Sequence, residues 1–295
     1  MTQHHSPRIA FFGTPELALP VLNTLADAGL SPTLVITAPD RPVGRKQLIT
    51  PPPVKTWAEE RTIPVIQPEA TTDPALLTAL HEHDIDLSIV FAYGYILPTT
   101  IIENPTHGTL NLHPSLLPQL RGPSPIRSAI LRDIRPTGVT IMQMDDQMDH
   151  GPILAQRTVT IPDSDWPPYG PELDTKLIEA GATLLTETIP HWCRGAITPT
   201  PQDHDQATYC HKLTKADGEL ALDPHDLPSG SDAHKALRTI RGLAGWPEAF
   251  FIYNGQRIKI HAAHIDENDT LRPTRITPAG KGETGFSDYL RSHVR

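Results

Sequence analysis

The residues with the clearest capacity for chemistry are an amide and an imidazole two positions apart, Asn111 and His113. Leucines at positions 110 and 112 alternate with them, which is the period of a strand. Side chains two apart on a strand point the same way, so this pair is expected to emerge together where Pro114 ends the strand. An amide donates hydrogen bonds and an imidazole moves protons near neutral pH. The alternative interpretation is structural, with Asn111 capping a turn and His113 a hydrogen-bonded, half-buried histidine.

The elements that must hold this pair come from a chain that alternates strands with helices. Short apolar runs at 8–12, 34–37, 63–66 and 87–91 are separated by helical or turn-rich stretches. This alternation predicts an α/β fold, a mostly parallel Rossmann-like sheet covered on both faces, with ligands at the carboxyl ends of the strands. The first strand is not followed by a Gly-x-Gly-x-x-Gly motif, which argues against a nucleotide cofactor.

An acidic turn further along supplies a candidate partner for the imidazole. Residues 137–144 predict another strand, and residues 145–151 follow it as a turn that contains Asp149. A carboxylate beside an imidazole fixes the orientation of the ring. An aspartate close to a glycine is also a common turn former, so the spacing alone leaves both roles open.

Composition narrows the class of protein. The 295 residues are 38% hydrophobic and suit two domains better than one, and no run is long enough for a membrane span. The N-terminus lacks the apolar core of a signal peptide, so we expect a cytoplasmic protein. Two cysteines are too few for a disulfide framework, and spacings such as His81-x-His83 lack further ligands, so no metal is expected.

The charge pattern bears on the partner. The net charge of −9 opposes binding to nucleic acid, but residues 205–295 carry equal numbers of acidic and basic side chains, so the excess lies before them. Within that acidic part, the turn-rich stretch 38–55 gathers Arg41, Arg45, Lys46 and Lys55. The stretch predicts either a loop that meets an anionic partner or a solvated, mobile loop.

The last third of the chain has its own pattern. A helix is expected from about residue 173 to 188, and residues 190–207 read as a linker. A second helical pattern spans 233–243. Runs at 250–253 and 257–261, joined by Asn254-Gly255, form the strongest hairpin signal in the sequence.

Several motifs in order resemble one known family. Asn111-x-His113, the run 115–118, Arg121-Gly122, the run 137–140 and Asp149-x-Gly151 resemble the catalytic domain of formyltransferases that use 10-formyltetrahydrofolate. Within that group, residues 39–45, 53–55 and 140–145 are similar to the methionyl-tRNA formyltransferases. The sequence departs from the family at His150, commonly a threonine, and at Pro123-Ser124, commonly two alanines.

The resemblance implies a one-carbon transferase of translation initiation, which moves a formyl group from 10-formyltetrahydrofolate to the methionine amino group of initiator methionyl-tRNA. Asn111 and His113 would donate to the formyl oxyanion, and Asp149 would hold His113 protonated or order a water. The folate would be bound by Phe91, Ala92, Tyr93, Gly94, Tyr95, Ile96, Leu97, Ser115, Leu116, Leu117, Pro118, Asp145 and Gly151. The tRNA would be bound by Arg41, Arg45, Lys46, Lys212 and Lys215.

The resemblance also implies a domain organisation. Residues 1–189 would form the catalytic domain, 190–207 a linker, and 208–295 a small OB-like, β-rich domain that binds tRNA. About two strands are missing from that barrel, so we expect either an abbreviated barrel or a hairpin packed on a helix. A monomer is expected.

Two other functions stay open at this point. The first is a formyltransferase whose acceptor is a small amine, such as an amino sugar nucleotide or glycinamide ribonucleotide. An enzyme of that kind needs neither the cationic loop nor the C-terminal domain. The second is a folate- or RNA-binding module without activity, which the presence of all three catalytic-type residues disfavours.

Overall fold

The structure is a computed structural model that describes residues 6–44 and 46–293. Its contacts divide the chain into two compact units. The first contains residues up to 121 together with 138–159 and 176–208, and the second contains 122–137, 160–175 and the chain from 209. The domain boundaries predicted from the sequence, at 189 and 208, stay a prediction.

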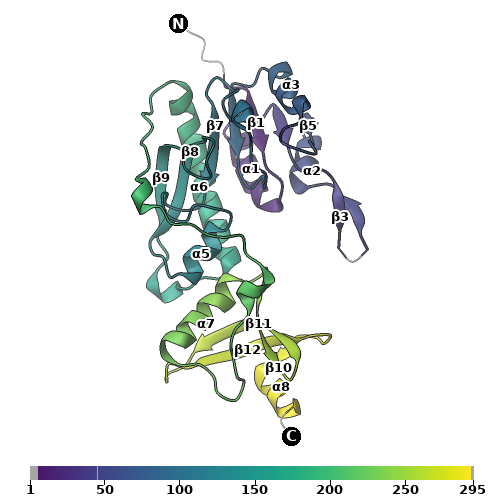
Figure 1. Ribbon diagram of the computed structural model, residues 1–295, viewed down its shortest axis with the longest axis vertical. Helices are drawn as coiled ribbons and strands as arrows, with labels where there is room; N and C mark the ends of the chain where they lie inside the picture. Colours follow the sequence, from purple (N-terminus) through teal and green to yellow (C-terminus); the bar gives the residue numbers. More distant parts are fainter. Residues whose placement is uncertain (1–5, 45, 294–295) are drawn as a thin grey trace. The chain divides into compact units, whose positions relative to one another are not determined.

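The first unit is built on a seven-stranded sheet with the order β5-β2-β1-β6-β7-β8-β9 (Figure 1). The pairs from β5 to β7 are parallel, and β8 runs antiparallel to β7. The predicted mostly parallel sheet is therefore confirmed. The strands are β1 (Ile9–Phe12), β2 (Leu34–Ile36), β5 (Val65–Ile66), β6 (Leu87–Val90), β7 (Thr109–His113), β8 (Thr137–Gln143) and β9 (Ile153–Val159).

Every residue of β1, β2 and β6 is buried, so both faces of the sheet are covered. Apolar side chains of α3 and α4 join Phe12 and Ile36 in one buried cluster. The helices between residues 6 and 193 are α1 (Leu19–Asp27), α2 (Pro53–Glu59), α3 (Pro74–Glu82), α4 (Thr99–Ile102), α5 (Pro125–Leu131) and α6 (Gly170–Cys193). Within the described ranges, no helix is both long and apolar enough to cross a bilayer.

Among the described residues up to 193, three features differ from the sequence prediction. The short helices α2 and α4 and the strand β9 are present although the pattern did not indicate them. Helix α6 continues past Thr188 and Pro190 to Cys193, because a proline one turn from the end removes only one backbone donor. The cationic stretch is a hairpin of β3 (Arg41–Val43) and β4 (Leu48–Thr50) rather than an irregular loop.

The β3–β4 hairpin projects from its unit and exposes apolar side chains at Val43, Leu48 and Ile49 (Figure 1). Lys55, on α2, is not part of the projection, because its ammonium lies 2.8 Å from a carboxylate oxygen of Asp40. The hydrogen bond from Lys55 lowers the pKa of Asp40. Lys55 is thus engaged within the fold.

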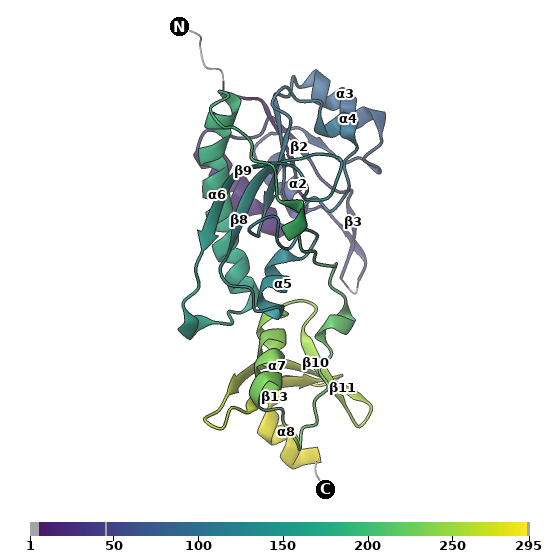
Figure 2. The ribbon, with the colours of Figure 1, turned by 60° about the vertical axis from the view of Figure 1, so that its left-hand side comes forward.

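The second unit contains an antiparallel sheet with the order β10-β11-β12-β13, on which α7 packs (Figure 2). Leu237 and Ile240 of α7 share a buried cluster with Phe251, Ile258 and Phe286. Four strands exceed a single hairpin, which favours the abbreviated, OB-like alternative. The elements are α7 (Gly230–Gly242), β10 (Ala249–Tyr253), β11 (Gln256–Ile265), β12 (Leu271–Pro278), β13 (Thr284–Gly285) and α8 (Phe286–His293).

The predicted Asn254-Gly255 hairpin is confirmed. Tyr253 pairs with Gln256, which leaves a two-residue turn in which φ is 47° at Asn254 and 73° at Gly255. Two positive φ angles define the turn type that matches the twist of a hairpin.

Replacing Gly255 by alanine should lower the free energy of unfolding by about 1 kcal/mol, because a Cβ is disfavoured at positive φ. Urea denaturation measures the change. Gly282→Ala is the matched control, since Gly282 has open space around it and no positive φ. Equal unfolding free energies for the two variants would contradict the turn assignment.

Candidate active site

Strand β7 places Asn111 and His113 on one face of the sheet. Leu112 points to the other face, where α6 approaches so closely that a Cβ on Gly181 would lie 3.0 Å from the Leu112 methyl carbons. Leu110 and Leu112 are buried as well. The strand period therefore put the amide and the imidazole side by side, as expected.

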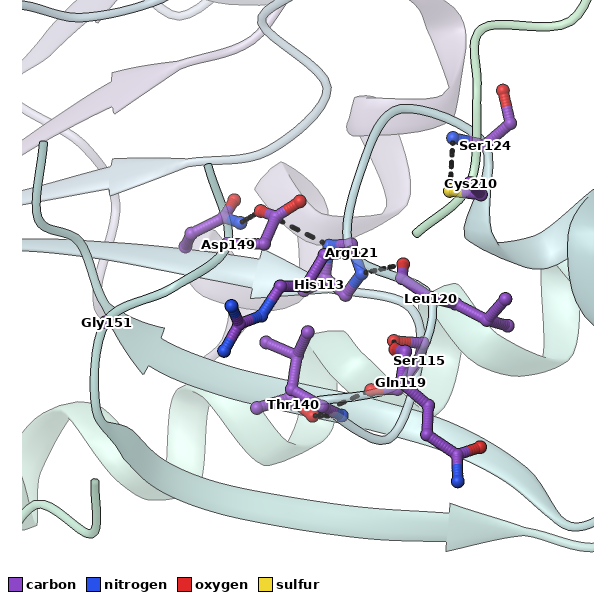
Figure 3. A network of polar contacts seen from close by, with 12 residues as sticks. His113, Ser115, Gln119, Leu120, Arg121, Ser124, Thr140, Asp149, Gly151 and Cys210 are labelled. Carbon is purple, nitrogen blue, oxygen red and sulfur yellow. Dashed lines mark hydrogen bonds and ion pairs between the residues drawn. The ribbon is translucent and has the colours of Figure 1, made fainter. Parts of the chain in front are cut away.

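Asp149 joins them from the turn after β8 (Figure 3). Its Oδ1 atom accepts a hydrogen bond from Nδ2 of Asn111 at 3.2 Å and lies 3.5 Å from Nδ1 of His113. The side chain of His113 is 5% exposed and that of Asp149 14%, so this contact is largely shielded from water. One carboxylate oxygen thus connects all three predicted catalytic residues.

The other edge of the His113 ring is held by a loop carbonyl. Nε2 of His113 lies 3.0 Å from the backbone oxygen of Leu120 (Figure 3). A carbonyl only accepts, so Nε2 carries the hydrogen and donates. Nδ1 is consequently the ring nitrogen that faces Asp149.

The loop between His113 and Leu120 is fixed by its own polar groups. The Ser115 hydroxyl donates to the Gln119 carbonyl at 2.6 Å, and the Thr140 hydroxyl donates to the Ser115 carbonyl at 2.7 Å. The backbone N–H of Leu117 donates to Thr140 Oγ1 at 3.1 Å. These contacts keep the Leu120 carbonyl in position at His113.

The residues predicted to bind folate divide into two groups. Phe91, Tyr93, Leu97, Ser115 and Leu117 are buried, and Ala92, Gly94, Tyr95, Ile96, Leu116 and Pro118 are at least partly exposed. Tyr93 packs edge-on against Phe12, and burial raises its pKa to about 12, so the phenol stays protonated. The 92–98 turn is therefore anchored in the core by Tyr93 and presents its backbone at Gly94 to solvent.

The acidic turn is stabilised by short-range contacts. Asp145 accepts from the backbone N–H of Gln147 at 3.0 Å, and one of its oxygens lies 2.6 Å from Nδ1 of His150. The His150 ring stacks on His204 with centroids 4.0 Å apart. The departure from the family at position 150 thus supplies a ring that packs on the segment after α6. Nothing in the structure explains the Pro123-Ser124 departure.

The predicted tRNA-binding cations are exposed where they are described. Arg41, at the start of the hairpin, donates to the Tyr95 hydroxyl at 2.9 Å and so ties the hairpin to the 92–98 turn. Lys46 lies at the hairpin tip, and Arg45 lies outside the described residues. Lys212 and Lys215 lie in the second unit. Within the described ranges, no group of three or more His, Cys, Asp or Glu side chains is placed to hold a metal.

Sequence reasoning missed residues that lie far along the chain. Gln202 is 5% exposed and bonds to the backbone of the Asp149 turn, and Thr208 bonds to the loop that ends at Arg121. Arg121, only 2% exposed, was noted as part of a motif but without a role. The separations of 53 and 88 residues carry no periodic signal, so only the fold reveals these contacts.

Comparison with known proteins places this site in a class. A profile described as "Formyl transferase" matches residues 7–183, and one described as "Formyl transferase, C-terminal domain" matches residues 230–287. The chain therefore belongs to the formyl transferase family. Its relatives include proteins named methionyl-tRNA formyltransferase, and the one from Halalkalibacterium halodurans is 39% identical over 308 residues, covering 96% of this chain and 94% of that protein. The resemblance inferred from the motifs and the assignment to the transferases are confirmed.

Solved structures agree on the fold. A methionyl-tRNA formyltransferase from Clostridium thermocellum superposes with a TM-score of 0.59 at 17% identity, covering 94% of this chain and all of that one. HypX from Aquifex aeolicus, in complex with tetrahydrofolic acid, has a TM-score of 0.59 at 17% identity and covers 97% of this chain and 47% of its own.

Gly151, at the end of the turn that carries Asp149, has no room for a side chain. A Cβ there would lie 2.0 Å from the Gln143 carbonyl oxygen, so Gly151→Ala must displace the turn. We expect a fall in formyl transfer of about a hundredfold, the cost of a misplacement near 1 Å. Initial rates measure it. Gly282→Ala again serves as control, and unchanged turnover in Gly151→Ala would show that the turn need not be held where it lies.

Proposed function

We propose that this enzyme transfers the formyl group of 10-formyltetrahydrofolate to the amino group of methionine on initiator methionyl-tRNA. The observation that carries the proposal is the convergence of Asn111 and His113 on one oxygen of Asp149. Relatives that are 39–40% identical over nearly the whole chain carry the name methionyl-tRNA formyltransferase, which supports this acceptor over a small amine. We place the reaction in the cytoplasm, with the enzyme acting as a monomer.

The reaction needs a stabilised oxyanion and a moved proton. The amine attacks the formyl carbon, and the carbonyl electron pair moves to oxygen. The oxyanion then re-forms the carbonyl as the bond to the folate nitrogen breaks, and that nitrogen takes up the proton the amine gives up. Hydrogen-bond donors aimed at the oxyanion usually lower the barrier of such acyl transfers more than any other group in the site.

Asn111 is the first donor. Its Nδ2 carries two hydrogens, and one of them is donated in the hydrogen bond to Asp149. The second hydrogen is free to bond the formyl oxygen, and because the Asp149 contact fixes the amide, the donor is oriented before the substrate arrives.

His113 is the second donor and the proton carrier. Its Nδ1 lies 3.5 Å from Asp149, an ion-pair distance longer than an ordinary hydrogen bond, so a proton on Nδ1 can be redirected to the oxyanion. The negative charge of Asp149 stabilises the protonated ring. Asp149 can in addition order the water through which the amine proton leaves.

We place the pterin of the folate between the 92–98 turn and the acidic turn at 145–151, with the predicted residues of both turns and of the 115–118 loop around it. Gly94 has φ of +83°, and a Cβ at this position would meet no atom within 4 Å, so the backbone here is accessible to a flat ring. The acceptor end of the tRNA would meet the hairpin at Arg41, Arg45 and Lys46, and the rest would meet the cations Lys212 and Lys215.

Incubation with 10-formyltetrahydrofolate and charged initiator tRNA should yield formylmethionyl-tRNA, which acid-gel electrophoresis resolves from the unformylated form. The same reaction with an amino sugar nucleotide or glycinamide ribonucleotide as acceptor should give no product. Turnover of a small amine without formylation of the tRNA would sink the proposal, and folate binding without turnover of any acceptor would favour a binding module.

Replacing His113 by alanine should lower kcat at least about a hundredfold while the KM for tRNA stays near its original value, because general acid–base groups contribute 10²- to 10⁴-fold. Steady-state kinetics measures both constants. His81→Ala, a surface histidine on α3, is the control and should behave like the unaltered enzyme. Normal turnover by the His113 variant would refute its catalytic role.

Replacing Lys46 by alanine should raise the KM for tRNA and reduce by about one the slope of the logarithm of affinity against the logarithm of salt concentration. The reason is the loss of one phosphate contact at the hairpin. Lys176→Ala, an exposed lysine of α6, is the control. If both variants keep the salt slope of the original enzyme, the hairpin does not contact the tRNA backbone.

A further inference from the structure

The segment after α6 contains a buried glutamine that bonds to the turn carrying Asp149. Nε2 of Gln202 donates to the backbone oxygens of Asp149 at 2.9 Å and Gly151 at 2.7 Å. Its Oε1 accepts from Nε and Nη2 of the buried Arg121, at 3.2 and 2.7 Å. Because a guanidinium only donates, Arg121 fixes which end of the amide faces the turn.

One of the two carbonyls that Gln202 engages belongs to a strained residue, Asp149. Asp149 has φ of +50°, a conformation that a residue with a side chain adopts at a cost. Such a conformation persists when surrounding contacts determine it, and the paired donors of Gln202 hold the backbone on both sides of His150. Gln202 therefore sets where the Asp149 carboxylate lies relative to β7.

Six residues further on, Thr208 bonds to the loop that faces the other edge of the imidazole. Its N–H donates to the Pro118 carbonyl at 3.2 Å, its carbonyl accepts from the Arg121 N–H at 2.8 Å, and its Oγ1 accepts from the Leu120 N–H at 2.9 Å. Leu120 has φ of +59°, which is rare for a leucine. Its carbonyl is the acceptor for Nε2 of His113.

We propose that Gln202 and Thr208 are positioning residues for the transfer reaction. Gln202 holds the Asp149 turn, and Thr208 holds the Leu120 carbonyl. The His113 ring lies between these two groups, so one short stretch of chain fixes the positions of both. This inference rests on the proposed catalytic roles of His113 and Asp149.

Two substitutions of Gln202 test the first part. Gln202→Glu keeps an oxygen for Arg121 but loses both donors to the turn, and Gln202→Met, of similar shape, loses both functions without adding charge. Both should lower kcat by about ten- to a hundredfold with little change in either KM, as expected for misplaced groups. Gln206→Glu, an exposed glutamine of the same segment, is the control for the added charge and should be unaffected.

A double-mutant cycle separates positioning from general loss of structure. If Gln202 acts through Asp149, Gln202→Met should cause little further loss of single-turnover rate in an Asp149→Asn background. Full additivity of the two losses would overturn the inference. Full activity of Asp149→Asn or His113→Ala alone would instead show that the proposed catalytic assignment has failed.

Thr208 offers a second, milder test. Thr208→Val removes the acceptor for the Leu120 N–H while keeping shape, and Thr208→Ser keeps the hydroxyl. We expect Thr208→Val to lower kcat about tenfold, the loss from one hydrogen bond at a site of fixed geometry, and Thr208→Ser to restore it. Equal rates for the two variants, with the melting temperature unchanged, would refute the role of Thr208.

Discussion

The hydrogen bond from Nε2 of His113 to the Leu120 carbonyl is the contact on which the rest of the site depends. It commits Nε2 to a donor role and leaves Nδ1 as the ring nitrogen beside Asp149. An imidazole free to rotate or to exchange tautomers would offer its lone pair to the wrong side for part of the time. The loop from Ser115 to Arg121 can thus be understood as the support of a single carbonyl.

That support is built from backbone conformations that are unfavourable by themselves. Leu120 and Asp149 both have positive φ, on opposite sides of the imidazole, and each such residue costs about 1–3 kcal/mol. The Thr140 hydroxyl, the Gln202 amide and Thr208 bond to the segments that contain them. Strain at the site is therefore balanced by hydrogen bonds from other parts of the chain.

Sequence patterns correctly predicted those structural features that depend only on residues close together in the chain. Strand periodicity placed Asn111 beside His113, and Asn254-Gly255 predicted its hairpin, because both depend on neighbours in sequence. The edge strand β9 escaped notice because it is only half-buried and its residues alternate weakly. The β3–β4 hairpin was interpreted as a loop because the stretch around it is dense in turn formers and cations.

The site as a whole was only partly predictable. The acidic turn made Asp149 a candidate partner for His113, but its spacing left the role open. The family motifs then implied that role, and the contact itself emerged only in the fold. Gln202 and Thr208 lie in a stretch whose proline and polar residues resemble a solvated connection, yet Gln202 is almost fully buried. Sequence gives no measure of burial for a polar residue outside a regular element, so contacts of this kind need coordinates.

The position of Gln202 and Thr208 in the sequence determines when, during synthesis, the contacts that support the site can form. When residue 183 has left the ribosome, Asn111, His113 and Asp149 have all been made, and so have all seven strands of the sheet. The two residues that bond to their supporting loops are added later, the second of them 88 positions after Leu120. A nascent chain would thus lack the contacts that Gln202 and Thr208 make with these loops until residue 208 has left the ribosome.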